Sequence, residues 1–236
     1  MAHDIGPTLR VLGGFDLRVG ARTVPLNASG KRVLACLAIG GPALRRETLA
    51  GRVWEWSSQA RAHANLRNAL WRIRRADRRL VETDHEQVRL GHDVVVDLHA
   101  SVAQARQLLD HGERYELAAT PAGLLEIDIL PDWDDDWVLL ERERHRQLRI
   151  HALEALSTRL IDAGWFAEAI DTAYAAIAAE PLRESAHDVL IRAHLAEGNR
   201  VEAARQLSAY RRLLHEELGL PPSARLEALV GDAVRA

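Results

Sequence analysis

Apolar residues recur at helical spacing along residues 59–76, and this stretch predicts a long amphipathic helix. The residues that share one face of it are Ala62, Leu66, Ala69, Leu70 and Ile73. The opposite face carries arginine, asparagine and tryptophan side chains, and Asp77 is the only acid between residues 59 and 81. The pattern therefore predicts a helix with one face in a core and a strongly basic face in solvent.

The residues before this helix change from an alternating pattern to a helical one. Alternation over 9–19, interrupted by a pair of glycines, and the short stretch 22–26 predict two or three short strands. Asn27 or Ser29 is suited to cap a helix over 31–39, and a Gly-Gly-Pro run ends that helix.

Two more helices and a hairpin complete this half of the chain. A second short helix is expected over 45–54, and Ser57 or Ser58 is expected to cap the helix 59–76. Residues 80–90 read strand, polar turn, strand, which predicts a β-hairpin. Strands, three helices and a hairpin in this order are typical of a winged helix, whose third helix enters the major groove of DNA.

Side chains on the outward face of the third helix suit DNA recognition. Arginine forks donate to phosphates and base edges, and asparagine fits the edge of adenine. Trp71 would pack on a thymine methyl or a sugar, or alternatively cover the wing hairpin. Lys31 and Arg32, in the first turn of the first helix, would meet a phosphate or remain solvated surface charges. The candidate DNA-binding residues are Lys31, Arg32, Arg61, Asn65, Arg67, Asn68, Trp71, Arg72 and Arg75.

Charge is divided unevenly along the chain. Residues 1–100 contain 16 Lys and Arg against 10 Asp and Glu, a balance of +6. The remaining residues contain 15 against 24, a balance of −9, and the two add to the net charge of −3. A basic half joined to an acidic half indicates a nucleic-acid module carrying a second module. We expect a DNA-binding domain over 1–98 and a helical domain over 99–236.

The acidic half is expected to be helical almost throughout. Helices are predicted around 102–109 and 113–119, followed by an irregular apolar connector and a long helix that begins near Trp137. The cluster Asp132, Asp134, Asp135 and Asp136 does not match a calcium-binding loop. Carboxylates at the start of a helix, stabilised by its dipole, explain it better than a metal site.

An internal repeat lies in the C-terminal part. Residues 164–169 and 198–203 both begin with glycine, end with Glu-Ala and lie 34 residues apart. With further alanines and Pro181, the first copy resembles a tetratricopeptide unit, in which small residues allow two antiparallel helices to cross closely. The predicted fold class is mainly α: an α+β winged helix of response-regulator type, followed by an all-α, tetratricopeptide-like half.

Several of these segments resemble one family. Residues 64–75 are similar to the recognition helix of the Streptomyces antibiotic regulatory proteins, with Leu66, Leu70, Ile73, Arg74 and Arg75 at the matching positions. Residues 131–137, 181–187 and 213–222 resemble the bacterial transcriptional activation domain of the same family. Two features depart from the family pattern: Trp71 replaces a small polar residue, and the wing tip at residues 84–86 is acidic, which predicts weak minor-groove contact.

The resemblance implies a sequence-specific DNA-binding transcriptional activator of a secondary-metabolite gene cluster. Such a protein would bind promoter direct repeats as a dimer through helix 59–76 and recruit RNA polymerase or its sigma factor. The alternative is a protein-interaction scaffold whose winged helix has lost DNA binding. Whether the helical repeats bind a small ligand stays open.

Other classes of protein are disfavoured by what the sequence lacks. It has no phosphate-binding Gly-x-x-x-x-Gly-Lys motif, no zinc-finger spacing of His and Cys, and no Ser/His/Asp set, so we expect no enzyme, cofactor or metal. There is no long apolar run and no signal peptide, which predicts a cytoplasmic protein that does not enter a membrane. Cys36 is the single cysteine and is expected to be a buried small hydrophobe.

Overall fold

The computed structural model describes residues 6–110 and 122–235, so the helix expected over 113–119 lies outside the described residues. The chain divides into two compact units. The first contains residues 1–101 and 127–145, and the second contains residues 102–126 and 146–236. The chain therefore leaves the first unit and returns to it before it completes the second.

The first unit begins with a sheet of short strands. These are β1 (Pro7–Arg10), β2 (Asp16–Val19), β3 (Arg22–Thr23) and β7 (Val95–Val96), in the order β3-β2-β1-β7. The neighbours β1, β2 and β3 pair antiparallel, whereas β7 pairs parallel to β1. The three leading strands confirm the prediction from the alternating residues.

Three helices follow in the predicted order: α1 (Ala28–Ile39), α2 (Arg46–Val53) and α3 (Gln59–Ala76). Asn27 caps α1, because its side-chain oxygen accepts a hydrogen bond from the Gly30 N–H at 3.1 Å. Ser58 occupies the cap position of α3, but its side chain accepts no hydrogen bond from the helix.

The wing is a three-stranded sheet. The hairpin strands β5 (Val81–Thr83) and β6 (Gln87–Leu90) are joined by β4 (Leu44–Arg45) in the order β4-β6-β5. Arg45 therefore lies in a strand, which corrects the prediction that it opens the second helix. The reason is main-chain pairing with the wing: Leu44 pairs with Val88, and the Arg46 N–H donates to the Glu86 carbonyl at 2.8 Å.

The apolar stripe predicted for α3 is confirmed. All of its residues are at most 4% exposed, and α3 packs against α1 and α2. The same core contains Cys36, which is fully buried, and burial raises the pKa of its thiol to about 11. Cys36 therefore behaves as the small hydrophobe that its surroundings in the sequence indicate.

Two later segments complete the first unit. The Asp97 carboxylate, at the start of α4 (Asp97–Leu109), accepts hydrogen bonds from the Val11 and Leu12 N–H groups at 2.9 and 3.1 Å. Further on, the Gly13 N–H donates to the carbonyl of Asp128 at 2.8 Å. The compact unit thus extends beyond the domain predicted over 1–98, because residues 127–145 satisfy main-chain groups that follow β1.

The first turns of α5 (Asp136–Asp162) hold this returning segment in place. Arg142 donates to the carbonyls of Ile129 at 2.8 Å, of Trp133 at 2.9 Å and of Leu130. Leu130 has a φ of +40°, an uncommon backbone conformation for a residue with a side chain. One guanidinium group therefore satisfies three carbonyls of an irregular loop, in which Ile129 and Leu130 are buried.

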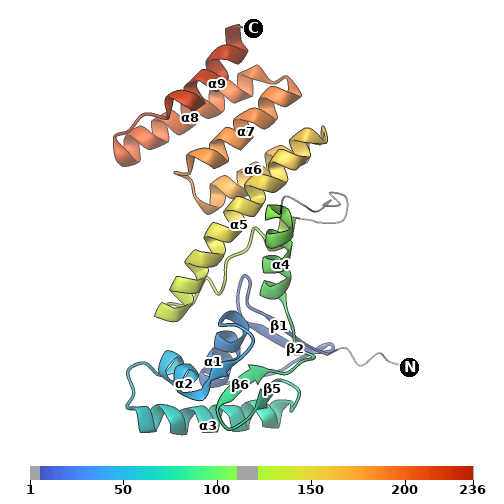
Figure 1. Cartoon of the computed structure of the whole chain (residues 1–236), viewed down its shortest axis with the longest axis vertical. Coiled ribbons are helices and arrows are strands. Elements are labelled where there is room, and N and C mark those ends of the chain that lie inside the picture. Colours follow the sequence, from blue (N-terminus) through green and yellow to red (C-terminus); the bar gives the residue numbers. More distant parts are fainter. Residues whose placement is uncertain (1–5, 111–121, 236) are drawn as a thin grey trace, which may run out of the picture. The chain divides into compact units, whose positions relative to one another are not determined.

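The second unit is a stack of helices (Figure 1). After the 3-10 turn η2 (Ala122–Leu124) and the rest of α5 come α6 (Phe166–Ala179), α7 (Glu184–Glu197), α8 (Arg200–Leu218) and α9 (Ala224–Arg235), each packed against the next. The repeat is visible in the backbone: Gly164 and Gly198 both have left-handed φ angles, +77° and +89°, just before α6 and α8. Buried alanines such as Ala169 and Ala186 lie within the unit's apolar core. The predicted mainly α fold class is confirmed.

Candidate nucleic-acid interface

The α3 helix brings most of the predicted residues together. Arg61, Arg67, Asn68, Trp71, Arg72 and Arg75 are exposed, and Asn65 is half-buried. The stripe on the other side of α3 is buried, so helix geometry directs these side chains away from the core. The α3 helix itself contains no acid, and the next acid along the chain, Asp77, is bonded to Arg79 at 3.0 Å, which lowers the pKa of its carboxyl. The result is a continuous positive surface along one helix.

Trp71 lies on this exposed surface instead of covering the wing. It is 59% exposed, and the guanidinium carbon of Arg75, one helical turn later, lies 5.3 Å from the centre of its ring. This is a cation–π contact, which is attractive because the aromatic face carries negative charge density. Of the two alternatives that the sequence leaves for Trp71, the exposed position favours contact with a ligand.

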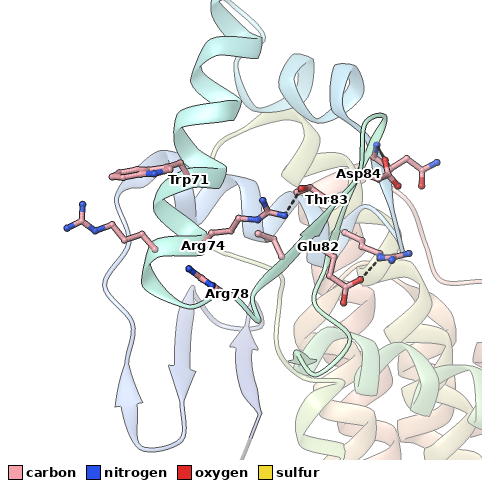
Figure 2. A pocket seen from close by; sticks show the side chains of 10 residues that line it. Trp71, Arg74, Arg78, Glu82, Thr83 and Asp84 are labelled. Carbon is pink, nitrogen blue, oxygen red and sulfur yellow. Dashed lines mark hydrogen bonds and ion pairs between the residues drawn. The ribbon is translucent and has the colours of Figure 1, made fainter.

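A groove of about 910 Å³ separates the C-terminal part of α3 from the wing (Figure 2). Trp71, Arg74 and Arg78 line the helix side, and Glu82 and Thr83 line the wing side. The Arg74 guanidinium donates to the Thr83 hydroxyl at 2.6 Å and so links the helix to the wing. Arg74, Arg78 and Thr83 were not among the predicted site residues, since the helical pattern alone does not show which arginine turns toward the hairpin.

Two acidic side chains of the wing, Glu82 and Asp84, have hydrogen-bond partners on the wing or just after it. Arg89 bonds Glu82 at 2.7 Å and, together with His92, holds the pKa of the Glu82 carboxyl below its ordinary value. The Asp84 carboxylate accepts hydrogen bonds from the main-chain N–H groups of Gln87 and Glu86 at 2.6 and 2.8 Å. These bonds stabilise the charged form and lower the pKa of the Asp84 carboxyl. These carboxylates therefore stabilise the hairpin, and the hydrogen-bond donors around them offset part of their negative charge.

Lys31 and Arg32 are placed apart from the α3 group. The Lys31 ammonium nitrogen lies 5.8 Å from the centre of the Phe15 ring, and Arg32 forms an ion pair with Asp135 at 3.2 Å. They line a separate pocket of the first unit together with Asp134 and Asp136. A phosphate there would have to approach five carboxylates that line the same pocket, so these two residues fit an intramolecular role better than DNA contact.

The aspartates themselves adopt the helix-start arrangement expected from the sequence. Asp136 lies in the first turn of α5, and the Asp135 carbonyl accepts the N–H of Val138 at 2.8 Å. In addition, the Asp135 carboxylate holds Arg32, a contact that the sequence did not indicate. Across residues 6–110 and 122–235, no cluster of three or more His, Cys, Asp or Glu side chains is suited to hold a metal ion.

Comparison with known families places the chain among transcription regulators. The family of the bacterial transcriptional activator domain matches residues 92–232. The chain belongs to this family. Its curated relatives support membership of the antibiotic regulatory protein group: the chain is 30% identical to the regulatory protein AfsR of Streptomyces griseus over 151 residues and 30% identical to AfsR of Streptomyces coelicolor over 133 residues.

The family members that match differ greatly in size from this chain. The aligned parts cover 64% and 56% of this chain but only 16% and 13% of the two AfsR proteins. A solved structure of Mycobacterium tuberculosis EmbR, in complex with a low-affinity phosphopeptide, covers 97% of this chain and 65% of its own, with a TM-score of 0.75 and 20% identity. EmbR therefore shares the fold.

In the part of the chain that the structure describes, no helix has the length and apolar character needed to cross a bilayer.

Proposed function

We propose that this transcription regulator binds duplex DNA in a sequence-specific way through the exposed face of α3 and activates a secondary-metabolite gene cluster. The observation that carries the proposal is the set of arginines on that face. Among the described residues, Arg61, Arg67 and Arg72 have no carboxylate partner, although ion pairs are common elsewhere on the molecule. Exposed guanidinium groups on one helix suit the chemistry of phosphates and base edges, because both accept hydrogen bonds from them.

The second unit is proposed to contact RNA polymerase or its sigma factor. The match to the activator family covers most of this unit, and its residues 102–126 and 146–236 contain 13 Lys and Arg against 17 Asp and Glu, a balance of −4, which disfavours DNA and favours a basic protein surface. We further propose that the protein acts in the cytoplasm and binds DNA as a dimer. A scaffold without DNA binding is the alternative, but the local pairing of Glu82 and Asp84 weakens the case made for it by the acidic wing.

Arg72→Ala is expected to weaken DNA binding and reduce its dependence on salt. If Arg67 and Arg72 meet phosphates, log K falls with log salt at a slope of about −0.9 for each contact, and one substitution flattens the slope by about one unit. Gel shifts of the full chain at several salt concentrations measure this. A slope near zero for the unsubstituted chain would support the scaffold alternative.

Asn68→Ala provides the matched contrast, because Asn68 lies on the same exposed face and carries no charge. If it reads a base edge, its loss costs about 1–3 kcal/mol on the preferred sequence and leaves the salt slope unchanged. If Asn68→Ala flattened the salt slope as Arg72→Ala does, the comparison would not distinguish base reading by Asn68 from phosphate contact by Arg72.

The operator is expected to be a direct repeat with half-sites about 10–11 base pairs apart. Two winged helices arranged head to tail contact the same side of the duplex when their half-sites lie a whole number of helical turns apart, and one turn is the shortest such spacing. An insertion of about 5 base pairs turns one half-site to the opposite side and should abolish cooperative binding, whereas a full-turn insertion should restore part of it. Equal affinity for all three spacings would indicate independent monomers.

A further inference from the structure

Trp71 and Arg75 form one exposed unit on α3. They are four residues apart, so a helix places them on neighbouring turns of the same face. The 5.3 Å distance from the Arg75 guanidinium carbon to the Trp71 ring puts the cation within the range of a cation–π contact. Arg75 makes no hydrogen bond or ion pair among the described residues, so the indole is the one group there with which its guanidinium makes a specific contact.

The chemistry of this contact leaves the hydrogen-bonding edge of Arg75 free. A guanidinium group over an aromatic ring uses its flat face or its charge in that contact, whereas its N–H donors lie in its plane. The other arginines near the end of α3 are used differently: Arg74 donates to Thr83 at 2.6 Å, and Arg79 donates to Asp77 at 3.0 Å. Arg75 is therefore held in place without losing its pair of parallel donors.

A held, planar pair of donors is the requirement for reading guanine. The O6 and N7 atoms of guanine accept two hydrogen bonds in the major groove, and the planar fork of arginine holds two donors in matching directions. A lysine would offer only a point charge, and a freely rotating arginine would lose more conformational entropy on binding.

We infer that Arg75 reads a guanine in each half-site and that Trp71 is the positioning residue that holds Arg75 for this contact. The inference rests on the proposed function, since it assigns a base to the α3 surface already proposed to bind DNA. It also gives the unusual tryptophan a role, because a small polar residue at this position could not hold the guanidinium group.

The inference is tested by selection of bound duplexes from a randomised 30-base-pair library with the full chain. Five proteins are compared: the unsubstituted chain and the variants Trp71→Ala, Trp71→Phe, Arg75→Ala and Arg75→Lys. Because both side chains are exposed, all variants should unfold at the same temperature as the unsubstituted chain, which circular dichroism checks. The measured quantity is the enrichment of each base at each position of the selected motif.

We expect one guanine of the motif to depend on this pair. A bidentate contact supplies discrimination of about fivefold to 150-fold, so Arg75→Ala and Arg75→Lys should both lose the preference at that position. Trp71→Ala should reduce it about two- to fivefold, which is the value of an exposed cation–π contact, and Trp71→Phe should retain most of it. Base preferences at the other positions should remain, because Trp71 and Arg75 act at one position only.

Two results would overturn the inference while leaving the proposed function intact. One is an unchanged motif for Trp71→Ala; the other is an Arg75→Ala protein that binds every sequence more weakly and has a flatter salt slope, which would identify a phosphate contact. By contrast, a library from which the unsubstituted chain selects no motif would overturn the proposed sequence-specific function and this inference together.

Discussion

A chain that ends after residue 98 should unfold at a much lower temperature than a chain that ends after residue 145. The longer chain keeps Ile129, Leu130 and Val138, each at most 1% exposed within the first unit. Burying such side chains is worth about 1.5–3 kcal/mol each, so their loss removes roughly 5 kcal/mol from a domain whose total stability is about 5–15 kcal/mol. Thermal and urea unfolding followed by circular dichroism measure the difference.

A single substitution in the full chain isolates the same contact. Arg142→Ala leaves the carbonyls of Ile129, Leu130 and Trp133 without their donor and should cost about 1–3 kcal/mol for the buried groups. Arg144→Ala is the matched control, because its exposed ion pair with Glu141 contributes at most about 1 kcal/mol. If residues 1–98 were as stable as residues 1–145, the returning segment would be only an attachment to a complete domain.

Loss of the second unit should abolish activation without abolishing DNA binding. Residues 1–145 are the shortest continuous chain that contains the whole first unit. This fragment should bind promoter DNA and fail to stimulate RNA polymerase, because the family's activator match extends to residue 232. Purified transcription on one promoter, at protein concentrations that give equal DNA occupancy, measures the effect. Full stimulation by residues 1–145 would remove the reason for assigning activation to the helical stack.

Two substitutions in α6 test whether stimulation requires the folded helical stack in a chain of full length. Ala169 is fully buried in the core of the second unit, whereas Ala167, two residues earlier, is exposed. Ala169→Asp places a charge in an apolar core and should disrupt the stack, while Ala167→Asp adds the same charge to the surface. Only the first variant should lose stimulation, and both should bind DNA as the unsubstituted chain does.

Elements with many side chains in a regular pattern could be predicted from the sequence. The stripe of α3 repeats through five buried residues, so its position, its buried face and the exposure of Arg72 and Asn68 follow from helical geometry. The hairpin β5–β6 and the leading strands were also predicted, because alternation and turn residues mark them.

Contacts made by main-chain groups could not be predicted in the same way. The strands β4 and β7 each contain two residues, too few for a pattern, and their pairing depends on segments distant in sequence. The partners of the site arginines are missed for the same reason: nothing near Arg32 in the sequence indicates Asp135, and nothing near Arg74 distinguishes it from Arg75. Side-chain type predicted the chemistry of the surface, whereas the tertiary fold decided which groups remain free.

The return of residues 127–145 to the first unit determines when the N-terminal unit of a newly made chain can complete its fold. Synthesis proceeds from the N-terminus at about 5–20 residues per second, so residues 1–101 leave the ribosome several seconds before the segment that completes their fold. During that interval Val11 and Gly13 lack their main-chain partners. The N-terminal unit of a nascent chain is thus incomplete until the first turns of α5 have emerged, although its strands are among the first residues to be made.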